Sequence, residues 1–234
     1  VESVDYWTHR DALDNKEVPA SLAIVGGGVI GMEFASFFCS LGVKVTVVEM
    51  MDEILGGMDK ELSAMLRAEY AKKGIQFLLS TKVVGLSKGE EGITVSYENA
   101  DGAGSVTAEK LLMSVGRRPV MKNLGLENLN LELTERRCIK VDEHLQSSVP
   151  GVYVCGDLNG VSLLAHTAVR EAEVAVHHII GKEDRMNYAA IPGVVYTNPE
   201  IASVGQSEEA LKAAGMAYQA LKLPMAYSGR VVAE

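Results

Sequence analysis

The chain has 234 residues, enough for one large domain or two small ones. Apolar residues make up 47% and charged residues 23%, so the composition excludes a disordered chain, a collagen-like fibre and a small disulfide-stapled scaffold. The net charge of −9 argues against nucleic acid and an anionic membrane surface as partners, because phosphate groups repel an acidic chain.

The first part of the chain predicts strands that alternate with helices. Residues 22–25 form a short apolar run between Pro19 and a group of glycines, which is typical of a buried strand. From residue 29 the apolar spacing becomes helical, and Gly42 supplies a left-handed stop. The apolar residues that share one face of this predicted helix are Ile30, Phe34, Phe37, Phe38 and Leu41. A β-branched strand at 43–48 and a helix at 59–73 complete a βαβα unit with right-handed crossovers.

The pattern changes after residue 80. Short alternating runs at 83–87, 93–98 and 105–107 are separated by glycines, which predicts a β-meander inserted before the sheet resumes at 110–115. We expect another short strand at 151–155 and helices at 168–180 and 207–214. One side of the helix at 168–180 carries Val169, Ala172, Val176 and Ile179 or Ile180.

Neither a membrane anchor nor a disulfide framework is expected. The longest apolar run, residues 22–32, contains four glycines and is shorter than the ~20 residues that a spanning helix needs. Residues 1–16 are polar and charged, unlike a secretory signal. The cysteines Cys39, Cys138 and Cys155 form no CxxC motif and indicate unpaired thiols in a reducing compartment. We therefore expect a soluble, cytoplasmic protein.

Residues 26–31, Gly-Gly-Gly-Val-Ile-Gly, match the GxGxxG pattern of a dinucleotide-binding turn. The motif follows a predicted strand and opens a predicted helix, as this fingerprint requires. Gly26 allows the tight turn, Gly28 lets backbone N–H groups reach a pyrophosphate, and Gly31 allows close packing of helix on strand. The anion is expected at the positive end of the helix. A glycine-rich turn without a ligand is the alternative.

An acidic residue, Glu49, ends the second predicted strand eighteen residues after Gly31. A carboxylate at this position accepts hydrogen bonds from an adenosine ribose and repels the additional phosphate of NADP. Because Met50 and Met51 follow instead of an arginine, we expect NAD in preference to NADP. An ordinary solvated strand end is the alternative. For Glu33, nucleotide contact and simple stabilisation of the helix N-terminus are both open.

Four segments, in the same order, resemble the pyridine nucleotide–disulfide oxidoreductases. They are the glycine turn with Glu49, Ser-Val-Gly-Arg-Arg-Pro at 114–119, Val-Tyr-Val-Cys-Gly-Asp at 152–157 with Leu-Leu-Ala-His at 163–166, and Val-Tyr-Thr-Asn-Pro-Glu at 195–200. The Leu-Ala-His triplet and Asn-Leu-Gly-Leu-Glu at 123–127 most resemble the branch of this family that oxidises dihydrolipoamide.

The resemblance implies an α/β fold with two cofactors. We expect a Rossmann-like parallel sheet with helices and an inserted β-meander, a second flavin-binding segment and a partial α+β interface domain. The corresponding boundaries are an NAD-binding domain at 1–118, a central segment of the FAD domain at 119–190, and the start of the dimerisation domain at 191–234.

The resemblance also implies binding residues. For NAD they are Gly26, Gly28, Val29, Ile30, Gly31, Glu33, Glu49, Val83 and Gly116. For FAD they are Asp157, Leu163, Leu164, Ala165 and His166, with Asp157 on the ribityl chain and the Ala165 backbone against the flavin. A turn-capping aspartate and a surface histidine are the alternatives for Asp157 and His166. Arg117 and Arg118 receive no role, and no metal site is expected.

Two parts of the family pattern lie outside this sequence: an FAD domain with a CxxxxC redox disulfide, and a His–Glu acid/base pair. We therefore assign no catalytic residue and expect the chain, inactive alone, to be the middle of a longer homodimeric enzyme. That enzyme would oxidise dihydrolipoamide carried by an acyltransferase or carrier protein and transfer hydride from flavin to NAD. The alternatives are another flavin disulfide reductase, an NADH oxidase, a non-catalytic NAD-binding module, and a structural subunit with vestigial motifs.

Overall fold

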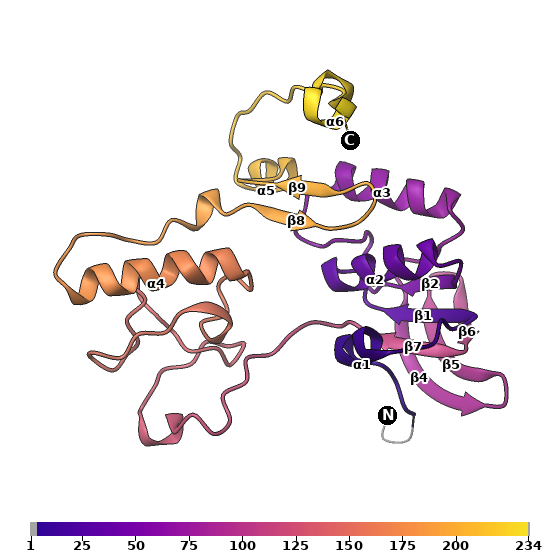
Figure 1. The fold of residues 1–234 in the computed structure, drawn as a ribbon, viewed down its shortest axis with the longest axis horizontal. Coiled ribbons are helices and arrows are strands. Elements are labelled where there is room, and N and C mark those ends of the chain that lie inside the picture. The colour runs from indigo at the N-terminus through magenta and orange to yellow at the C-terminus, as the bar shows by residue number, and fades with distance from the viewer. Residues whose placement is uncertain (1–3, 234) are drawn as a thin grey trace.

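The computed structural model describes residues 4–233, which form three parts (Figure 1). We call residues 4–113 the sheet lobe, residues 129–186 the α4 lobe, and residues 191–233 the end segment. The helices are α1 (His9–Asp14), α2 (Val29–Ser40), α3 (Lys60–Lys72), α4 (Ala165–Ile179), α5 (Glu208–Ala213) and α6 (Gly229–Ala233). The strands are β1 (Ser21–Val25), β2 (Lys44–Val48), β3 (Gln76–Leu78), β4 (Lys82–Gly89), β5 (Gly92–Asn99), β6 (Gly102–Ala108), β7 (Lys110–Met113), β8 (Gly193–Val195) and β9 (Ile201–Ser203). Short 3-10 turns lie at Leu126–Asn128, Gly156–Leu158, Tyr188–Ala190 and Met225–Tyr227.

A parallel sheet forms the centre of the sheet lobe. Its strand order is β3-β2-β1-β7, with Ile24 of β1 paired with Val47 of β2 and Leu112 of β7. Leu22 and Ile24 have no exposed surface, because a parallel strand in the middle of a sheet is covered on both faces. The predicted alternation of strands and helices in this lobe is confirmed.

The antiparallel sheet β4-β5-β6 is inserted between β3 and β7, as the glycine-separated runs predict. Its inner residues Ile93 and Val95 pack with Ala23 and Leu111 of the parallel sheet in one buried cluster. The α/β fold class with an inserted meander is therefore confirmed. The sheet resumes at 110–113 and not through residue 115.

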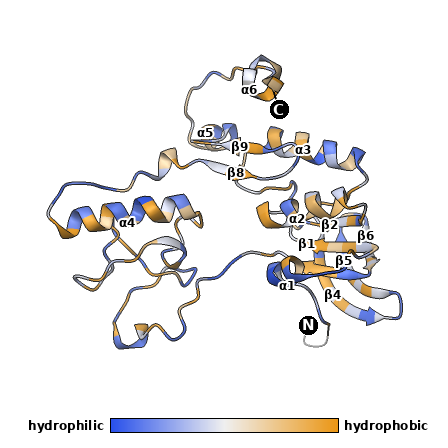
Figure 2. Cartoon of the chain, viewed as in Figure 1, coloured by the Kyte–Doolittle hydropathy of each residue, from blue (hydrophilic) through white to orange (hydrophobic). Residues whose placement is uncertain are grey.

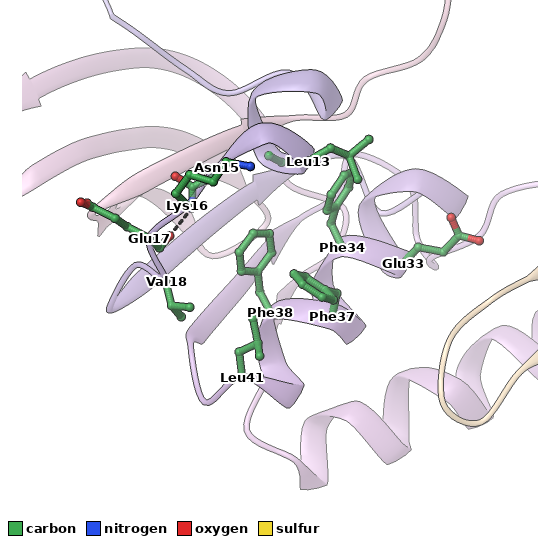
Figure 3. Close-up of a pocket in the computed structure, with 11 residues that line it drawn as sticks. Leu13, Asn15, Lys16, Glu17, Val18, Glu33, Phe34, Phe37, Phe38 and Leu41 are labelled. Atoms are coloured by element: carbon green, nitrogen blue, oxygen red, sulfur yellow. Dashed lines mark hydrogen bonds between the residues drawn. The ribbon is translucent and has the colours of Figure 1, made fainter.

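The predicted apolar face of α2 is only partly buried. Phe38 is 2% exposed, but Phe37 and Leu41 are 56% and 48% exposed. The sheet instead takes a side of the helix that includes Met32 and Ala35, both without exposed surface. Phe38 packs in the same buried cluster as the strand residues, whereas Phe37 and Leu41 point away from it. Together with α1, several of them line a mainly apolar cavity of about 380 Å³ (Figure 3).

The α4 lobe differs from its prediction in two ways. Residues 151–155 form no regular strand; Tyr153 makes only an isolated bridge to Gln146. Helix α4 begins three residues earlier than predicted, and its predicted apolar side is exposed, with Val169 at 62% and Val176 at 53%. Hydrophobic residues recur along this helix in Figure 2. The buried side of α4 consists of Thr167, Glu171, Val174 and Ala175.

The loop that follows α4 carries a carboxylate, Asp184, that is bonded to two residues of the helix. Asp184 accepts hydrogen bonds from Arg170 at 2.6 Å and from His177 Nδ1 at 2.7 Å. These two bonds hold the pKa of the Asp184 carboxyl below its usual range, with Arg170 the larger cause. The loop after α4 is thereby fastened to the helix.

The end segment begins with β8 and β9, which lie beside α2 and α3 (Figure 1). Its backbone is bonded to both helices: Tyr196 N–H donates to Glu33 Oε1 at 2.9 Å, and Asn198 N–H donates to the Tyr70 hydroxyl at 3.0 Å. The predicted helix near 207–214 is present as α5, capped by the Ser207 side chain.

Candidate functional site

The glycine turn between β1 and α2 is held by close backbone contacts. Gly26 has φ +104°, and a Cβ atom there would lie 2.3 Å from the Ser114 carbonyl oxygen. A Cβ atom on Gly31 would lie 2.0 Å from the Gly26 carbonyl oxygen. The Gly26 N–H donates to the Val48 carbonyl at 2.9 Å, which ties the turn to β2. Only glycine fits at these two positions, because real Cβ atoms never approach backbone so closely.

The N-terminus of α2 is open on its outer side. Gly28 is the N-cap residue, and a Cβ atom there would meet no atom within 4 Å. Its φ of −72° is also permitted for other residues, so neither packing nor backbone conformation inside the chain requires glycine. Val29 is 41% exposed and Ile30 is half-buried. A helix N-terminus with this free approach attracts an anion through its N–H groups and its dipole.

Glu49 lies directly beside this turn. Its Oε2 accepts a hydrogen bond from Gly27 N–H at 2.6 Å, and its Oε1 accepts one from Met51 N–H at 2.7 Å. These bonds fix the direction of a half-buried carboxylate at the carboxyl end of β2. In a doubly wound α/β sheet, that edge is where a dinucleotide binds. The structure therefore brings Glu49 and the glycine turn together.

The other proposed NAD residues have different surroundings. Glu33 accepts the bond from Tyr196 N–H, so it connects the first turn of α2 to the end segment. Val83 is half-buried on β4 and packs against the cluster shared by the meander and the parallel sheet. Gly116 follows β7 with φ +115°, is exposed, and would meet no atom within 4 Å if it carried a Cβ.

Residues proposed for FAD lie in the α4 lobe at the start of α4. Asp157 is in the 3-10 turn Gly156–Leu158, and its side chain is 50% exposed. Leu164 is the N-cap of α4, and Leu163, Ala165 and His166 are exposed beside it. The His166 ring Nε2 lies 2.8 Å from the Pro192 carbonyl oxygen.

One ion pair connects the two groups of proposed residues. Arg117 Nε lies 4.0 Å from Asp157 Oδ2, and both side chains are about half-exposed. The segment after Gly116 therefore reaches the turn that carries Asp157. The sequence assigned Arg117 no role, and only the three-dimensional arrangement reveals this contact.

Sequence reasoning also missed Glu171. This glutamate on α4 has no exposed surface. Its Oε2 accepts from Gly156 N–H at 2.6 Å, and its Oε1 accepts from the Tyr188 hydroxyl at 2.7 Å. Burial and the bond to Glu171 raise the pKa of Tyr188 above its usual range. Burial, with a smaller contribution from Glu171, also raises the pKa of the Cys155 thiol. Charged residues are rarely buried completely, so a helical pattern alone does not predict this position.

Two kinds of feature are absent from the described residues. No cluster of three or more metal-binding side chains occurs among residues 4–233. No helix within that range is long and apolar enough to cross a membrane.

Comparison with known proteins assigns the family. Residues 1–172 match the family described as pyridine nucleotide-disulphide oxidoreductase, and residues 191–234 match the dimerisation domain of the same description. The chain therefore belongs to the pyridine nucleotide-disulphide oxidoreductase family, and the resemblance stated from its motifs is confirmed.

The curated relatives include several dihydrolipoyl dehydrogenases. The protein of this name from Geobacillus stearothermophilus is 39% identical over 95% of this chain and 47% of its own length. The mitochondrial one from Homo sapiens is 41% identical over 94% of this chain and 44% of its own length. The chain thus spans about half the length of the curated relatives it matches.

Solved structures give the same grouping. LpdA from Mycobacterium tuberculosis matches with a TM-score of 0.86 and 29% identity, over 97% of this chain and 49% of that one. The HOCl-induced flavoprotein disulfide reductase RclA from Escherichia coli matches with a TM-score of 0.85 and 25% identity, over 100% of this chain and 55% of that one.

Proposed function

We propose that this chain forms the NAD-binding part and one FAD-binding segment of a dihydrolipoamide dehydrogenase. The observation that carries the proposal is the glycine turn at the start of α2 with the Glu49 carboxylate fixed beside it. The relatives named dihydrolipoyl dehydrogenase support dihydrolipoamide as the substrate of the whole enzyme. FAD, when bound, supplies hydride transfer between a dithiol–disulfide centre and NAD.

The surroundings of the turn fit an NAD pyrophosphate. The open side of Gly28 allows backbone N–H groups at Val29 and Ile30 to approach the phosphate oxygens, while Gly26 and Gly31 maintain the turn. The open space at Gly116 is proposed for the nicotinamide ring, and Ile30 is proposed for the same end of the nucleotide. Val83 is proposed for the adenine end. Glu33 is proposed for the nucleotide site, although its bond to Tyr196 already gives it a structural role.

NAD is proposed in preference to NADP because of Glu49. Its carboxylate is held by the N–H groups of Gly27 and Met51, so it cannot swing away from an incoming 2′-phosphate without losing both bonds. A ribose diol donates hydrogen bonds to this carboxylate, whereas a phosphate dianion is repelled by it.

FAD is proposed to contact the start of α4. Asp157 offers a partly exposed carboxylate that can accept hydrogen bonds from ribityl hydroxyls. Leu163, Leu164, Ala165 and His166 surround the helix N-terminus, where N–H groups favour an electron-rich edge of the flavin. The protein groups that bind the remaining parts of FAD are proposed to come from a further domain of the enzyme.

The wider organisation follows from the same proposal. The NAD-binding domain comprises 1–118, the FAD segment 119–190, and the start of the dimerisation domain 191–234. The match of the end segment to a dimerisation domain supports a homodimer. A lipoamide-carrying acyltransferase or carrier protein is proposed as the partner. A cytoplasmic location is proposed because all three cysteines are free.

The test compares nucleotides, flavin and turnover in the protein expressed from its complete gene. We expect tighter binding of NADH than NADPH, co-purification with FAD, and NAD reduction that depends on dihydrolipoamide. Tighter binding of NADPH would contradict the role of Glu49. FAD with NADH oxidation by oxygen, but no reaction with dihydrolipoamide, would indicate an NADH oxidase. Binding of NADH without FAD would indicate a non-catalytic module.

A further inference from the structure

Glu171 is a buried carboxylate that lies between the Asp157 turn and the residues that lead to the end segment. Its two oxygens accept hydrogen bonds from neutral donors, the Gly156 N–H and the Tyr188 hydroxyl. Removing a carboxylate from water is unfavourable unless its oxygens find donors. A helix core position of this kind is normally apolar, so the bonds that Glu171 makes are the reason to look for a role.

The first bond acts on the turn that carries Asp157. Gly156 has φ +74°, and it is the residue directly before Asp157. The segment before this turn forms no regular strand. Backbone bonds hold its neighbours: Val154 N–H donates to the Leu145 carbonyl at 2.9 Å, and Ile139 N–H donates to the Leu158 carbonyl at 2.8 Å. The Gly156 N–H between them is held by Glu171. The turn is internally closed by Asn159 N–H donating to the Gly156 carbonyl at 3.0 Å. The Glu171 bond then attaches the closed turn to α4.

The second bond orients the carboxylate itself. Tyr188 lies in the 3-10 turn Tyr188–Ala190, and its hydroxyl donates a hydrogen bond to Glu171 Oε1 at 2.7 Å. Because one oxygen is held by Tyr188, the other points to Gly156. A tyrosine hydroxyl is protonated, and therefore a donor, throughout the neutral range, and burial and the bond to Glu171 raise the pKa of Tyr188 further.

We propose that Glu171 is a positioning residue for FAD: it fixes the Gly156 peptide and thereby the direction of the Asp157 carboxylate. Tyr188 assists by orienting Glu171. The proposal rests on the proposed function, because it assumes that Asp157 binds the ribityl chain. Neither Glu171 nor Tyr188 is required to touch the cofactor.

Two substitutions at position 171 separate hydrogen bonding from packing. Glu171→Met keeps the length of the side chain but removes both acceptors, so the Gly156 N–H loses its partner. Glu171→Gln keeps one acceptor for Gly156, and its amide can donate to the Tyr188 oxygen. We expect a weaker FAD affinity by tenfold or more in the first variant and by less than threefold in the second.

The matched control is Glu173→Met, on the same helix. Glu173 is an exposed glutamate whose side chain pairs with Arg170 and does not reach the Asp157 turn. It should retain the FAD affinity of the unsubstituted protein. NADH affinity should stay within twofold in all variants, because the sheet lobe is untouched.

The experiment measures FAD dissociation constants by flavin fluorescence and NADH dissociation constants by nucleotide fluorescence, in the protein expressed from its complete gene. Selective loss of FAD affinity in Glu171→Met, with rescue by Glu171→Gln, supports the proposal. Equal FAD affinity in all variants overturns it and leaves the proposed function intact. If the unsubstituted protein binds no FAD, both fail. Should Glu171→Met not fold, Tyr188→Phe replaces it: about threefold weaker FAD binding supports the proposal, and unchanged binding overturns it.

Discussion

In two turns of this molecule a carboxylate accepts the N–H of a glycine: the turn that opens α2, and the turn Gly156–Leu158, which ends before α4 begins. In the turn between β1 and α2, Glu49 holds Gly27; in the turn before α4, Glu171 holds Gly156. The surroundings differ. The first turn follows a strand in the middle of a parallel sheet and has a half-buried carboxylate, whereas the second follows an irregular segment and has a carboxylate with no exposed surface.

The difference shows two ways to fix a binding turn. A sheet fixes backbone positions through its ladder, so the turn after it depends on glycines that permit contacts too close for a Cβ atom. A turn without a sheet depends on a side chain that reaches its N–H from a neighbouring helix. The carboxylate beside the sheet is therefore available for a ligand, while the carboxylate on α4 is used entirely inside the protein.

Gly31→Ala should have the largest effect, because its Cβ atom would lie 2.0 Å from the Gly26 carbonyl oxygen. Helix α2 would have to shift away from β1, which we expect to lower the free energy of unfolding by about 3 kcal/mol and to abolish NADH binding. Urea unfolding and NADH fluorescence measure both. In the control Gly28→Ala the new Cβ atom meets nothing, so the loss should stay below about 1 kcal/mol while NADH binding still weakens. Equal stability of the two variants would contradict the steric explanation.

Glu49→Gln tests the carboxylate beside the sheet. Removing its charge should weaken NADH binding about tenfold, since a hydrogen bond to a charged group contributes about 1.5–3 kcal/mol. The preference for NADH over NADPH should shrink at the same time, because the 2′-phosphate meets less repulsion. Parallel titrations with the two nucleotides check this. Glu98→Gln, an exposed site on β5, is the control and should change neither affinity.

Gly156→Ala tests the turn that lacks a sheet. Here the φ is +74° and the nearest atom to a new Cβ is the Ala168 Cβ at 3.3 Å, so the strain is mainly conformational. We expect a loss of about 1–2 kcal/mol of unfolding free energy and weaker FAD binding. Gly181→Ala has the same φ of +74° but lies after α4 with no neighbour within 4 Å. Gly181→Ala should lose a similar amount of unfolding free energy and keep its FAD affinity. If it lost FAD affinity as much as Gly156→Ala does, the special role of the Gly156 turn would be refuted.

Asp184→Asn should have the smallest effect and is confined to the α4 lobe. Arg170 and His177 hold the pKa of this carboxyl below its usual range, so its contribution to stability is present above the unfolded pKa of about 4 and is lost as pH falls below that value. The variant should therefore be less stable than the unsubstituted protein at neutral pH, and the difference should disappear in acid. Unfolding curves across this range test the sign. A difference that grows on acidification would show the assignment to be wrong.

The sequence predicts the sheet lobe well because its signals agree with one another. Apolar strands, a change to helical spacing and glycine stops mark β1, α2 and β2, and the glycine-separated runs mark the meander. The α4 lobe is harder. The prediction of a strand at 151–155 is wrong because an apolar run can be buried under a helix without pairing in a sheet. The prediction of the buried side of α4 is also wrong. Hydrophobicity alone favours burial of Val169 over Glu171, but the hydrogen bonds that Glu171 accepts allow this glutamate to be buried while Val169 is exposed.

For the candidate site, the motif alone predicts the proximity of Glu49 to the glycine turn, because both lie at the carboxyl ends of adjacent parallel strands. It does not reveal that Arg117 reaches Asp157, since this contact depends on the path of an irregular connection. Nor does it reveal that Glu33 receives the Tyr196 N–H, a bond between residues 163 positions apart. The FAD-binding residues of the α4 lobe are predicted from the family resemblance alone, and the FAD-binding measurements test them.

The stretch 188–198 is fastened at one end to the α4 lobe and at the other to the sheet lobe. Tyr188 is bonded to Glu171, whereas the backbone of Tyr196 and Asn198 is bonded to Glu33 and Tyr70. In mechanical terms this stretch is a link between the two lobes. A force that pulls the two lobes apart is borne by bonds to three helices, α4 through Glu171, α2 through Glu33 and α3 through Tyr70. The turns before α4 and α2 are therefore mechanically coupled through residues 188–198.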